Sequence, residues 1–244
     1  MSEPSAAPAP QPTEQAGLIE DFVDIFFSPA KVFARRAAAS PAMPFVIIVA
    51  LIIAMYYVNR NVMSGIMESE MTTQMEKSMK SNPAVTAEQM ERMKAVGSKF
   101  AQFGVLVGIP VALVVLGLVT WLVGKVLGGT LSYGTGLLIA SFAWVPRVVE
   151  SVLASVQGLL LDTSRMTSHF QLQLGPARFL DPATAPAWQT ALLGRLDLIT
   201  LWVTLLLAIG LVFAGKVPRT KLVVAGVVVW IVGSVPALLT ALRG

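Results

Sequence analysis

Long apolar runs are the feature that most constrains this sequence. Five of them hold about 20 mainly apolar residues, the length that a helix needs to cross the hydrocarbon layer of a bilayer. Only 13% of the 244 residues are charged, so a soluble globule of this size would lack a polar surface. A helix satisfies its own backbone hydrogen bonds where lipid offers none. The sequence therefore predicts an all-α fold, a polytopic transmembrane bundle of five helices.

The positions of the runs place the spans within a transmembrane domain that covers residues 40–244. The predicted spans are Pro41–Met63, Phe100–Val123, Leu131–Leu161, Leu196–Ala214 and Thr220–Leu242. The third run is too long for one straight span, and Pro146 inside it removes a backbone donor, which predicts a kink.

Small residues within the spans favour close helix packing, without indicating a particular interface. Close helix approach in lipid favours glycine, and two glycine pairs, Gly104 with Gly108 and Gly124 with Gly128, are spaced four apart. Gly117 and Gly210 also fall inside spans. These positions favour a packed bundle.

The N-terminal region divides into two parts. Residues 1–17 are rich in Pro, Ala, Ser and Gln without apolar periodicity, which predicts a disordered tail. Residues 18–39 predict two short amphipathic helices that carry Phe26 and Phe33, the second beginning at Ser28-Pro29. Such helices beside a first span lie in the membrane interface, or they pack on the loops as a cytosolic pair. Phe26 and Phe33 are candidate partner contacts.

The connection between the first two spans, residues 64–99, predicts a helical hairpin standing about 25 Å off the membrane at 1.5 Å per residue. Its methionines recur at every fourth position and so share one helix face, before Asn82-Pro83 breaks the helix. The stripe is either a soft-metal site or an apolar seam that holds the hairpin together or contacts a partner. We favour the seam or partner contact and predict no metal; the candidate contacts are Met67, Met71 and Met75.

Ionisable residues inside a membrane are expensive and usually functional. Arg147 and Glu150 follow Pro146 at a three-residue spacing, so they share a helix face and can pair. The pair lines a polar cavity, clasps two helices, or lies near an interface between two half-spans. Asp197 precedes the fourth span beside Arg195 and is interpreted as the residue that begins that helix.

Enzyme chemistry finds little support in the sequence. The chain has no cysteine and one histidine, His169, which is remote in sequence from any plausible nucleophile. It also lacks the H-E-x-x-H and phosphate-loop motifs. A net charge of +4 without a long basic run argues for an anionic membrane surface and against nucleic acid. We therefore predict a protein that is not an enzyme and has no cofactor.

The short turns set the orientation. Those around Lys125 and Lys216–Lys221 contain basic residues and no acid, which predicts a cytoplasmic N-terminus by the positive-inside rule.

Three segments resemble the Yip family of small five-span membrane proteins. The lead-in is Phe26-Phe27-Ser28-Pro29-Ala30-Lys31-Val32-Phe33. The fourth-span region is Leu196-Asp197-Leu198-Ile199-Thr200-Leu201-Trp202 with a later Gly210, and the third-span region carries Trp144-Val145-Pro146. Eukaryotic members bind Rab-type GTPases through a long acidic N-terminal region that this chain lacks. The resemblance therefore implies a bacterial-type member in the inner membrane.

Two functions follow. The first is a membrane scaffold or adaptor that binds partner proteins, or a second copy of itself, in or at the lipid bilayer. The alternative is a transporter or channel component with Arg147 and Glu150 in a polar path, whose small-molecule substrate the sequence does not name.

Overall fold

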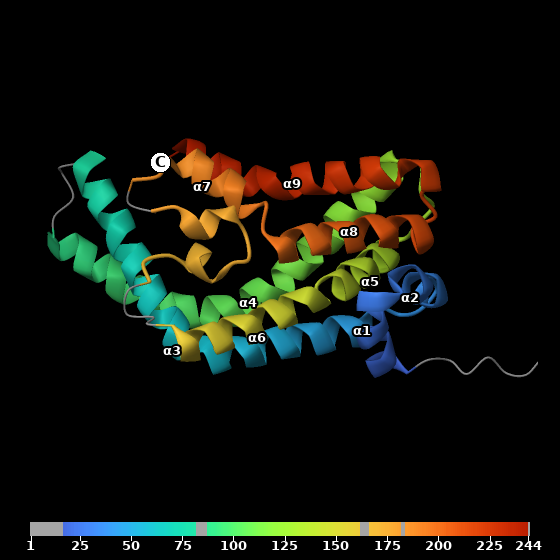
Figure 1. The fold of residues 1–244 in the computed structure, drawn as a ribbon, viewed down its shortest axis with the longest axis horizontal. Coiled ribbons are helices and arrows are strands. Elements are labelled where there is room, and N and C mark those ends of the chain that lie inside the picture. The colour runs from blue at the N-terminus through green and yellow to red at the C-terminus, as the bar shows by residue number, and fades with distance from the viewer. Residues whose placement is uncertain (1–16, 82–86, 162–165, 182–183, 244) are drawn as a thin grey trace, which may run out of the picture.

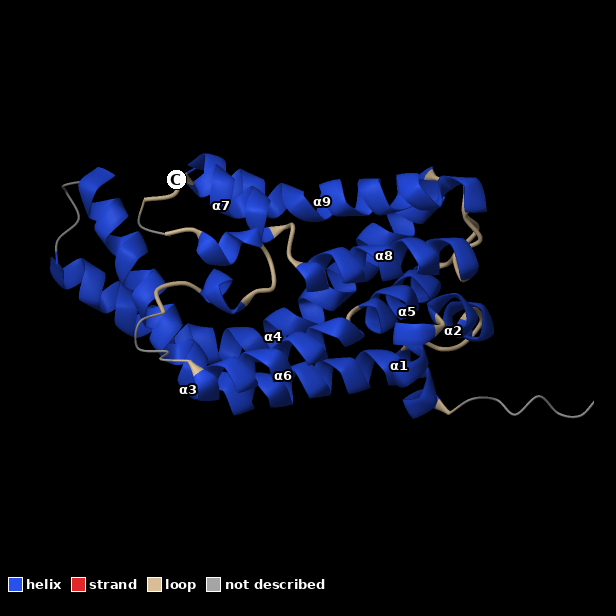
Figure 2. Ribbon diagram, in the orientation of Figure 1, coloured by secondary structure: helices blue, strands red, loops and turns tan. Residues whose placement is uncertain are grey.

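The chain folds into an elongated bundle of helices (Figures 1 and 2). The computed structural model describes residues 17–81, 87–161, 166–181 and 184–243, and these ranges contain helices, turns and no strand. The predicted tail, apart from Gly17, and the Asn82-Pro83 break lie outside the described residues. The helices along the long axis include α3 (Ala42–Ser81), α4 (Ala87–Val126), α6 (Val145–Leu160), α8 (Leu198–Phe213) and α9 (Leu222–Arg243).

Four described helical segments are long and apolar enough to cross a membrane. They are Ala42–Thr73, Gly104–Val126, Tyr133–Leu160 and Arg219–Leu239. A fifth crossing arises if α7 (Ala187–Gly194) and α8, which are bent by 55° at their junction, together make one span. The chain therefore has four or five candidate spans, and the predicted number of five depends on this bent pair.

The third predicted span contains a break, and the break comes two residues before its proline. Helix α5 (Tyr133–Ala143) ends where Trp144 donates its backbone N–H to the Ala140 carbonyl. Helix α6 then begins at Val145, which puts Pro146 in its first turn. Proline is tolerated there because its missing N–H would have no partner within the helix.

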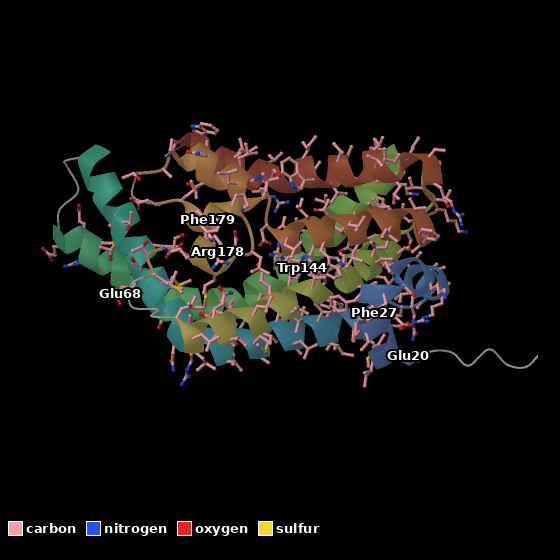
Figure 3. The ribbon with its side chains drawn as sticks, viewed as in Figure 1. Glu20, Phe27, Glu68, Trp144, Arg178 and Phe179 are labelled. Atoms are coloured by element: carbon pink, nitrogen blue, oxygen red, sulfur yellow. The ribbon has the colours of Figure 1, made fainter. Side chains whose placement is uncertain are left out.

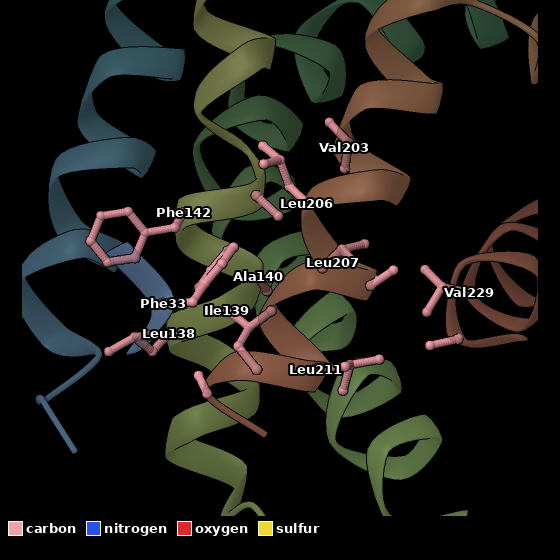
Figure 4. Packing of buried hydrophobic residues seen from close by; sticks show 14 of the residues in the cluster. Phe33, Leu138, Ile139, Ala140, Phe142, Val203, Leu206, Leu207, Leu211 and Val229 are labelled. Atoms are coloured by element: carbon pink, nitrogen blue, oxygen red, sulfur yellow. The ribbon is translucent and has the colours of Figure 1, made fainter. Parts of the chain in front are cut away.

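The core lies where α5 crosses α8, and it also takes in α2 (Pro29–Arg36) and α9. Figure 4 shows Phe142 and Leu138 of α5 beside Phe33 of α2. Leu207 of α8 lies between α5 and Val229 of α9 (Figure 4). All five side chains are almost completely buried, so this half of the bundle holds itself together by packing in the manner of a protein interior.

Glycine brings α4 and α5 into backbone contact. A Cβ added at Gly136 of α5 would lie 2.7 Å from the carbonyl oxygen of Gly117 of α4. Gly117 therefore mediates close approach as its position in a span predicts. At Gly104 and Gly108 an added Cβ would meet no atom of the described residues within 4 Å.

The two N-terminal helices, α1 (Leu18–Phe27) and α2, pack on the bundle. Phe26 meets the Trp202 ring of α8 edge-on at a centroid distance of 5.4 Å, and Phe33 meets Phe142 at 6.3 Å. Asp21 is fully buried and forms ion pairs with Arg35 and Arg36 that join α1 to α2. Helices α1 and α2 therefore pack against α5 and α8 of the bundle, not against its loops.

The face of α1 that lies away from the bundle is apolar and exposed. Ile19, Val23 and Phe27 are spaced four apart and all point away from the bundle core, Phe27 with 81% of its surface exposed. Phe27 and Glu68 lie toward opposite ends of the long axis (Figure 3).

Helices α3 and α4 are much longer than a span. Each has 40 residues, which corresponds to about 60 Å at 1.5 Å per residue, about twice the hydrocarbon thickness. Their far ends project beyond the other helices (Figure 1). The two helices thus form the arms of a hairpin, and the residues that connect them, 82–86, lie outside the described residues.

Candidate functional site

Arg147 and Glu150 form an ion pair on α6. The Arg147 Nη1 donates to Glu150 Oε2 at 2.7 Å, and Nη2 donates to the Thr200 hydroxyl of α8 at 2.9 Å. Each charged side chain is about a quarter exposed, 27% for Arg147 and 25% for Glu150. The pair therefore ties α6 to α8, and Glu150 also lines a cavity described below.

Asp197 belongs to the same network, and it begins α8 as predicted. Its carboxylate is fully buried and accepts hydrogen bonds from the backbone N–H groups of Thr200 and Leu174, both at 2.9 Å. The first bond caps the helix. The second bond ties Leu174, which lies 23 positions earlier in the sequence, to the start of α8. Nothing in the sequence indicated that Leu174 would be this partner.

Asn59 is a polar residue that the sequence reasoning missed. It lies on α3 and donates its amide to the carbonyl oxygens of Met55, at 3.0 Å, and Ser151 of α6, at 2.9 Å. Its amide oxygen accepts from the Ser155 hydroxyl at 2.8 Å. The sequence could have indicated Asn59 as a candidate, because it is a polar side chain inside the first predicted span.

Glu70 joins the hairpin arm α3 to the segment that begins with η2 (His169–Leu172). One carboxylate oxygen of Glu70 accepts from the Ser168 hydroxyl at 2.9 Å and from the His169 backbone N–H at 2.8 Å. The same oxygen lies 2.6 Å from Nδ1 of His169. The segment that begins with η2 is therefore fastened to α3 at that end.

These elements line a partly open pocket of about 300 Å³ between α3, α4, α6 and the η2 segment. Its polar side chains come from α3, α6 and the η2 segment, which the hydrogen bonds just described hold together. Its apolar wall comes mainly from α3 and α4. The lining residues are Ile52, Met55, Tyr56, Asn59, Met63, Val105, Ile109, Glu150, Ser151, Ala154, His169, Leu172 and Gln173.

The predicted methionine stripe is divided among different surroundings. Met63 lines the pocket, and Met67 is exposed on α3 with 41% of its surface accessible. The sulfur of Met71 lies 3.8 Å from the position that a Cβ at Gly97 would occupy, so it packs between the hairpin arms. Met75 is half-buried. The stripe is therefore partly a seam and partly surface.

The aromatic candidates lie on the bundle side of their helices. Phe33 is fully buried against Phe142, so it is a core residue of this chain and not a surface that a partner can reach. Phe26 is half-buried against Trp202. The accessible aromatic side chain of α1 is instead Phe27, because it continues the outward stripe of that helix.

Metal-binding chemistry is not assembled in the described ranges. No three His, Cys, Asp or Glu side chains come together there in a way that could hold an ion. The pocket is lined by hydrogen-bonding groups and by Glu150, the acidic member of the Arg147–Glu150 ion pair.

Residues 23–240 match the family model described as the Yip1 domain. No curated protein and no solved structure matches the chain.

Proposed function

This chain belongs to the Yip1 domain family, and from that premise we propose that it is an integral membrane adaptor that binds partner proteins in or at the bilayer. The match covers most of the chain, including all the candidate spans. An adaptor role needs a surface for a partner and no catalytic centre.

The projecting hairpin carries this proposal. About half the length of α3 and α4 exceeds what a bilayer core can cover, so the far arms stand in the aqueous phase. Met67 is exposed at the base of this projection, where a flexible apolar side chain suits an adaptable protein contact.

Its test compares two exposed methionines of the same helix. The protein and its variants Met67→Ser and Met43→Ser are purified from native membranes in mild detergent. Met43, near the other end of α3, is 63% exposed and serves as the matched control. We expect Met67→Ser to lose a co-purifying complex that Met43→Ser retains. Two differently tagged copies in one cell distinguish a homo-oligomer from a foreign partner. Equal complexes in all three samples contradict the proposal.

We also infer a bacterial inner membrane location with a cytoplasmic N-terminus. Lys221 donates to the Leu127 carbonyl at 2.9 Å, which brings the two acid-free basic turns together. The exposed stripe of α1 would then lie in the cytoplasmic interface. Since the chain has no cysteine, single cysteines at Lys216 and at Met67 report topology directly. An impermeant thiol reagent added to intact cells should label the second and spare the first; the reverse pattern contradicts the orientation.

A second candidate is a transporter or channel component, and the pocket beside Glu150 favours it. Proton and small-ion fluxes are followed with enclosed dyes in liposomes that contain the protein. Under this proposal Glu150→Gln lowers the flux, whereas Val149→Ala, an exposed neighbour on α6, leaves it unchanged. Flux that is insensitive to Glu150→Gln rules out the transporter or channel function.

A further inference from the structure

Two turns are tied together at one end of the bundle. One runs from the end of α4 to α5 (residues 125–132), and the other joins α8 to α9 (residues 214–221). Besides the lysine hydrogen bond described above, the Thr130 backbone N–H donates to the Gly215 carbonyl at 3.2 Å. A Cβ at Gly129 would lie 2.7 Å from that same carbonyl oxygen, so the two backbones are in contact. They form one surface, which we call the joined turns.

The joined turns carry four exposed cations and no acid. The cations are Lys125, Lys216, Arg219 and Lys221. Within the described residues, no carboxylate lies at ion-pair distance from any of them. The Arg219 guanidinium lies over the Phe213 ring, 5.2 Å from its centroid, and in the same described ranges its N–H groups have no hydrogen-bond acceptor. These cations are therefore available to an anion from outside the chain.

Helices α1 and α2 hold the other charged groups that lie at this end of the bundle (Figure 1). They carry three carboxylates and three cations, which cancel: Glu20, Asp21 and Asp24 against Lys31, Arg35 and Arg36. Asp21 is paired with both arginines, and Asp24 with one of them. The positive excess of this end therefore belongs to the joined turns.

The joined turns lie where two candidate spans end. The span in α4 ends at Val126, and the span that contains α9 begins at Arg219. Helix α4 contacts α9, so both ends belong to the same side of the bundle. Val126 and Val223 are 82% and 74% exposed, which puts apolar surface directly beside the cations. The positive-inside rule explains why such turns are basic, but it does not require them to be tied together.

The backbone at Lys216 is unusual. Its φ of 57° is a left-handed conformation, which glycine and asparagine adopt more easily than lysine does. Among the non-glycine residues that the structure describes, Lys216 alone has a positive φ. Strained backbone of this kind is found preferentially at functional sites. A lysine retained at such a position is expected if its charge is used.

We propose that the joined turns bind the headgroup of an anionic phospholipid. Arg219 and Lys216 donate to the phosphate oxygens, and the acyl chains lie along Val126 and Val223. A planar guanidinium suits a phosphate because it can donate two parallel hydrogen bonds. Basic pockets at the ends of membrane helices are a known type of site for anionic headgroups. The site depends neither on the adaptor role nor on the orientation of the chain.

The test measures lipid binding to the full-length protein in a neutral detergent. Native mass spectrometry gives the dissociation constant of the first bound phosphatidylglycerol, and of phosphatidylcholine with identical acyl chains. Phosphatidylcholine has the same phosphate, but its trimethylammonium group is repelled by the cations of the joined turns. We expect phosphatidylglycerol to bind at least tenfold more tightly. Equal affinities overturn the proposal.

Three variants locate the site. Lys216→Asn removes a charge at a position whose conformation asparagine tolerates, so it should fold and weaken phosphatidylglycerol binding about fivefold, the effect of one basic residue at an anionic surface. Arg219→Gln should fold, since Arg219 is exposed, and have a similar effect. Lys31→Gln is the matched control, because it removes an exposed lysine at the same end but on α2. It should bind as the original chain does.

Circular dichroism checks that each variant is folded. Equal weakening in Lys31→Gln and Lys216→Asn would mean that only the general surface charge matters, and it overturns the proposal. Unchanged affinity in both Lys216→Asn and Arg219→Gln overturns it as well.

Two soluble anions check that the ligand is a lipid. Glycerol 3-phosphate carries the phosphate without acyl chains, and pentaglutamate carries acidic side chains. Neither should displace phosphatidylglycerol at equal concentration, because neither covers the apolar surface beside the cations. Displacement by glycerol 3-phosphate would assign the joined turns to a soluble phosphate, and displacement by pentaglutamate to an acidic protein segment. Either result overturns the lipid assignment.

Discussion

The side-chain amide of Asn59 on α3 donates to the backbone carbonyl of Ser151 on α6 at 2.9 Å, across 92 positions of the sequence. This bond joins the first span to the second half of the third, beside the pocket. It is one of a small set of polar contacts that fix the rotation of one apolar helix against another. Packing of apolar side chains in lipid determines that rotation only weakly.

Removing this amide should loosen that junction. Asn59→Ala is expected to lower the free energy of unfolding by about 1 kcal/mol, since buried interhelical hydrogen bonds in membranes are modest. Unfolding in detergent, followed by circular dichroism, measures the change. Asn61→Ala, on the exposed face of the same helix, is the control and should change stability by less than about 0.5 kcal/mol.

The α4–α5 contact should not accept a methyl group. Gly136→Ala would press a Cβ against the Gly117 carbonyl, a backbone atom that cannot rotate away. We expect a loss of about 1–3 kcal/mol, or rearranged packing. Gly108→Ala has open space and should be neutral or stabilising, because alanine favours a helix. Thermal unfolding in detergent compares them, and equal midpoints would refute this account of the contact.

The two phenylalanines on the N-terminal helices should behave oppositely. Phe33→Ala leaves a cavity against Phe142 and is expected to destabilise the protein by about 3 kcal/mol or more. Phe27→Ala should leave the stability of the folded protein within about 0.5 kcal/mol, since Phe27 contacts little of the chain. Denaturant titration of both variants in the same detergent checks this contrast.

The Arg147–Glu150 pair should show coupling in a double-mutant cycle. Glu150→Gln and Arg147→Gln each strand the opposite charge, and the double variant should be more stable than the sum of the single losses by about 1 kcal/mol. Exchange of the two charges should restore part of the stability that the single variants lose, because the Thr200 hydroxyl can donate to a carboxylate at position 147. Strict additivity would mean that the pair contributes nothing as a pair.

Glu70 should hold the η2 segment in place. Glu70→Ala removes the acceptor for Ser168 and His169, so the segment should open more often. Trypsin should then cleave after Arg178 several-fold faster, which mass spectrometry of the fragments detects. Glu68→Ala, two residues earlier and exposed, is the control. Equal cleavage rates would show that other contacts hold this segment.

Much of the site could be predicted from residues that lie close together in the sequence. Arg147 and Glu150 were predicted to pair because three residues along a helix place two side chains on one face. Asp197 was predicted to begin a helix because its carboxylate suits the first turn. The break in the third span was predicted from Pro146, although the structure puts it at Trp144. Each of these depends on neighbours within about one helical turn.

The remaining contacts join distant segments. Asn59 meets Ser151, Glu70 meets His169, and Phe33 is buried against Phe142, and no spacing in the sequence encodes those distances. For the same reason Met67, Met71 and Met75 were treated alike, although one is exposed and another lies between the hairpin arms.

The sequence by itself determined that the chain is helical and lies in a membrane, because run length and composition decide whether a segment can leave water. Only the tertiary structure decided which faces of those helices meet, and with them the pocket beside Glu150. Apolar helices in lipid have no strong preference for one rotation until specific small and polar residues from different spans come into contact.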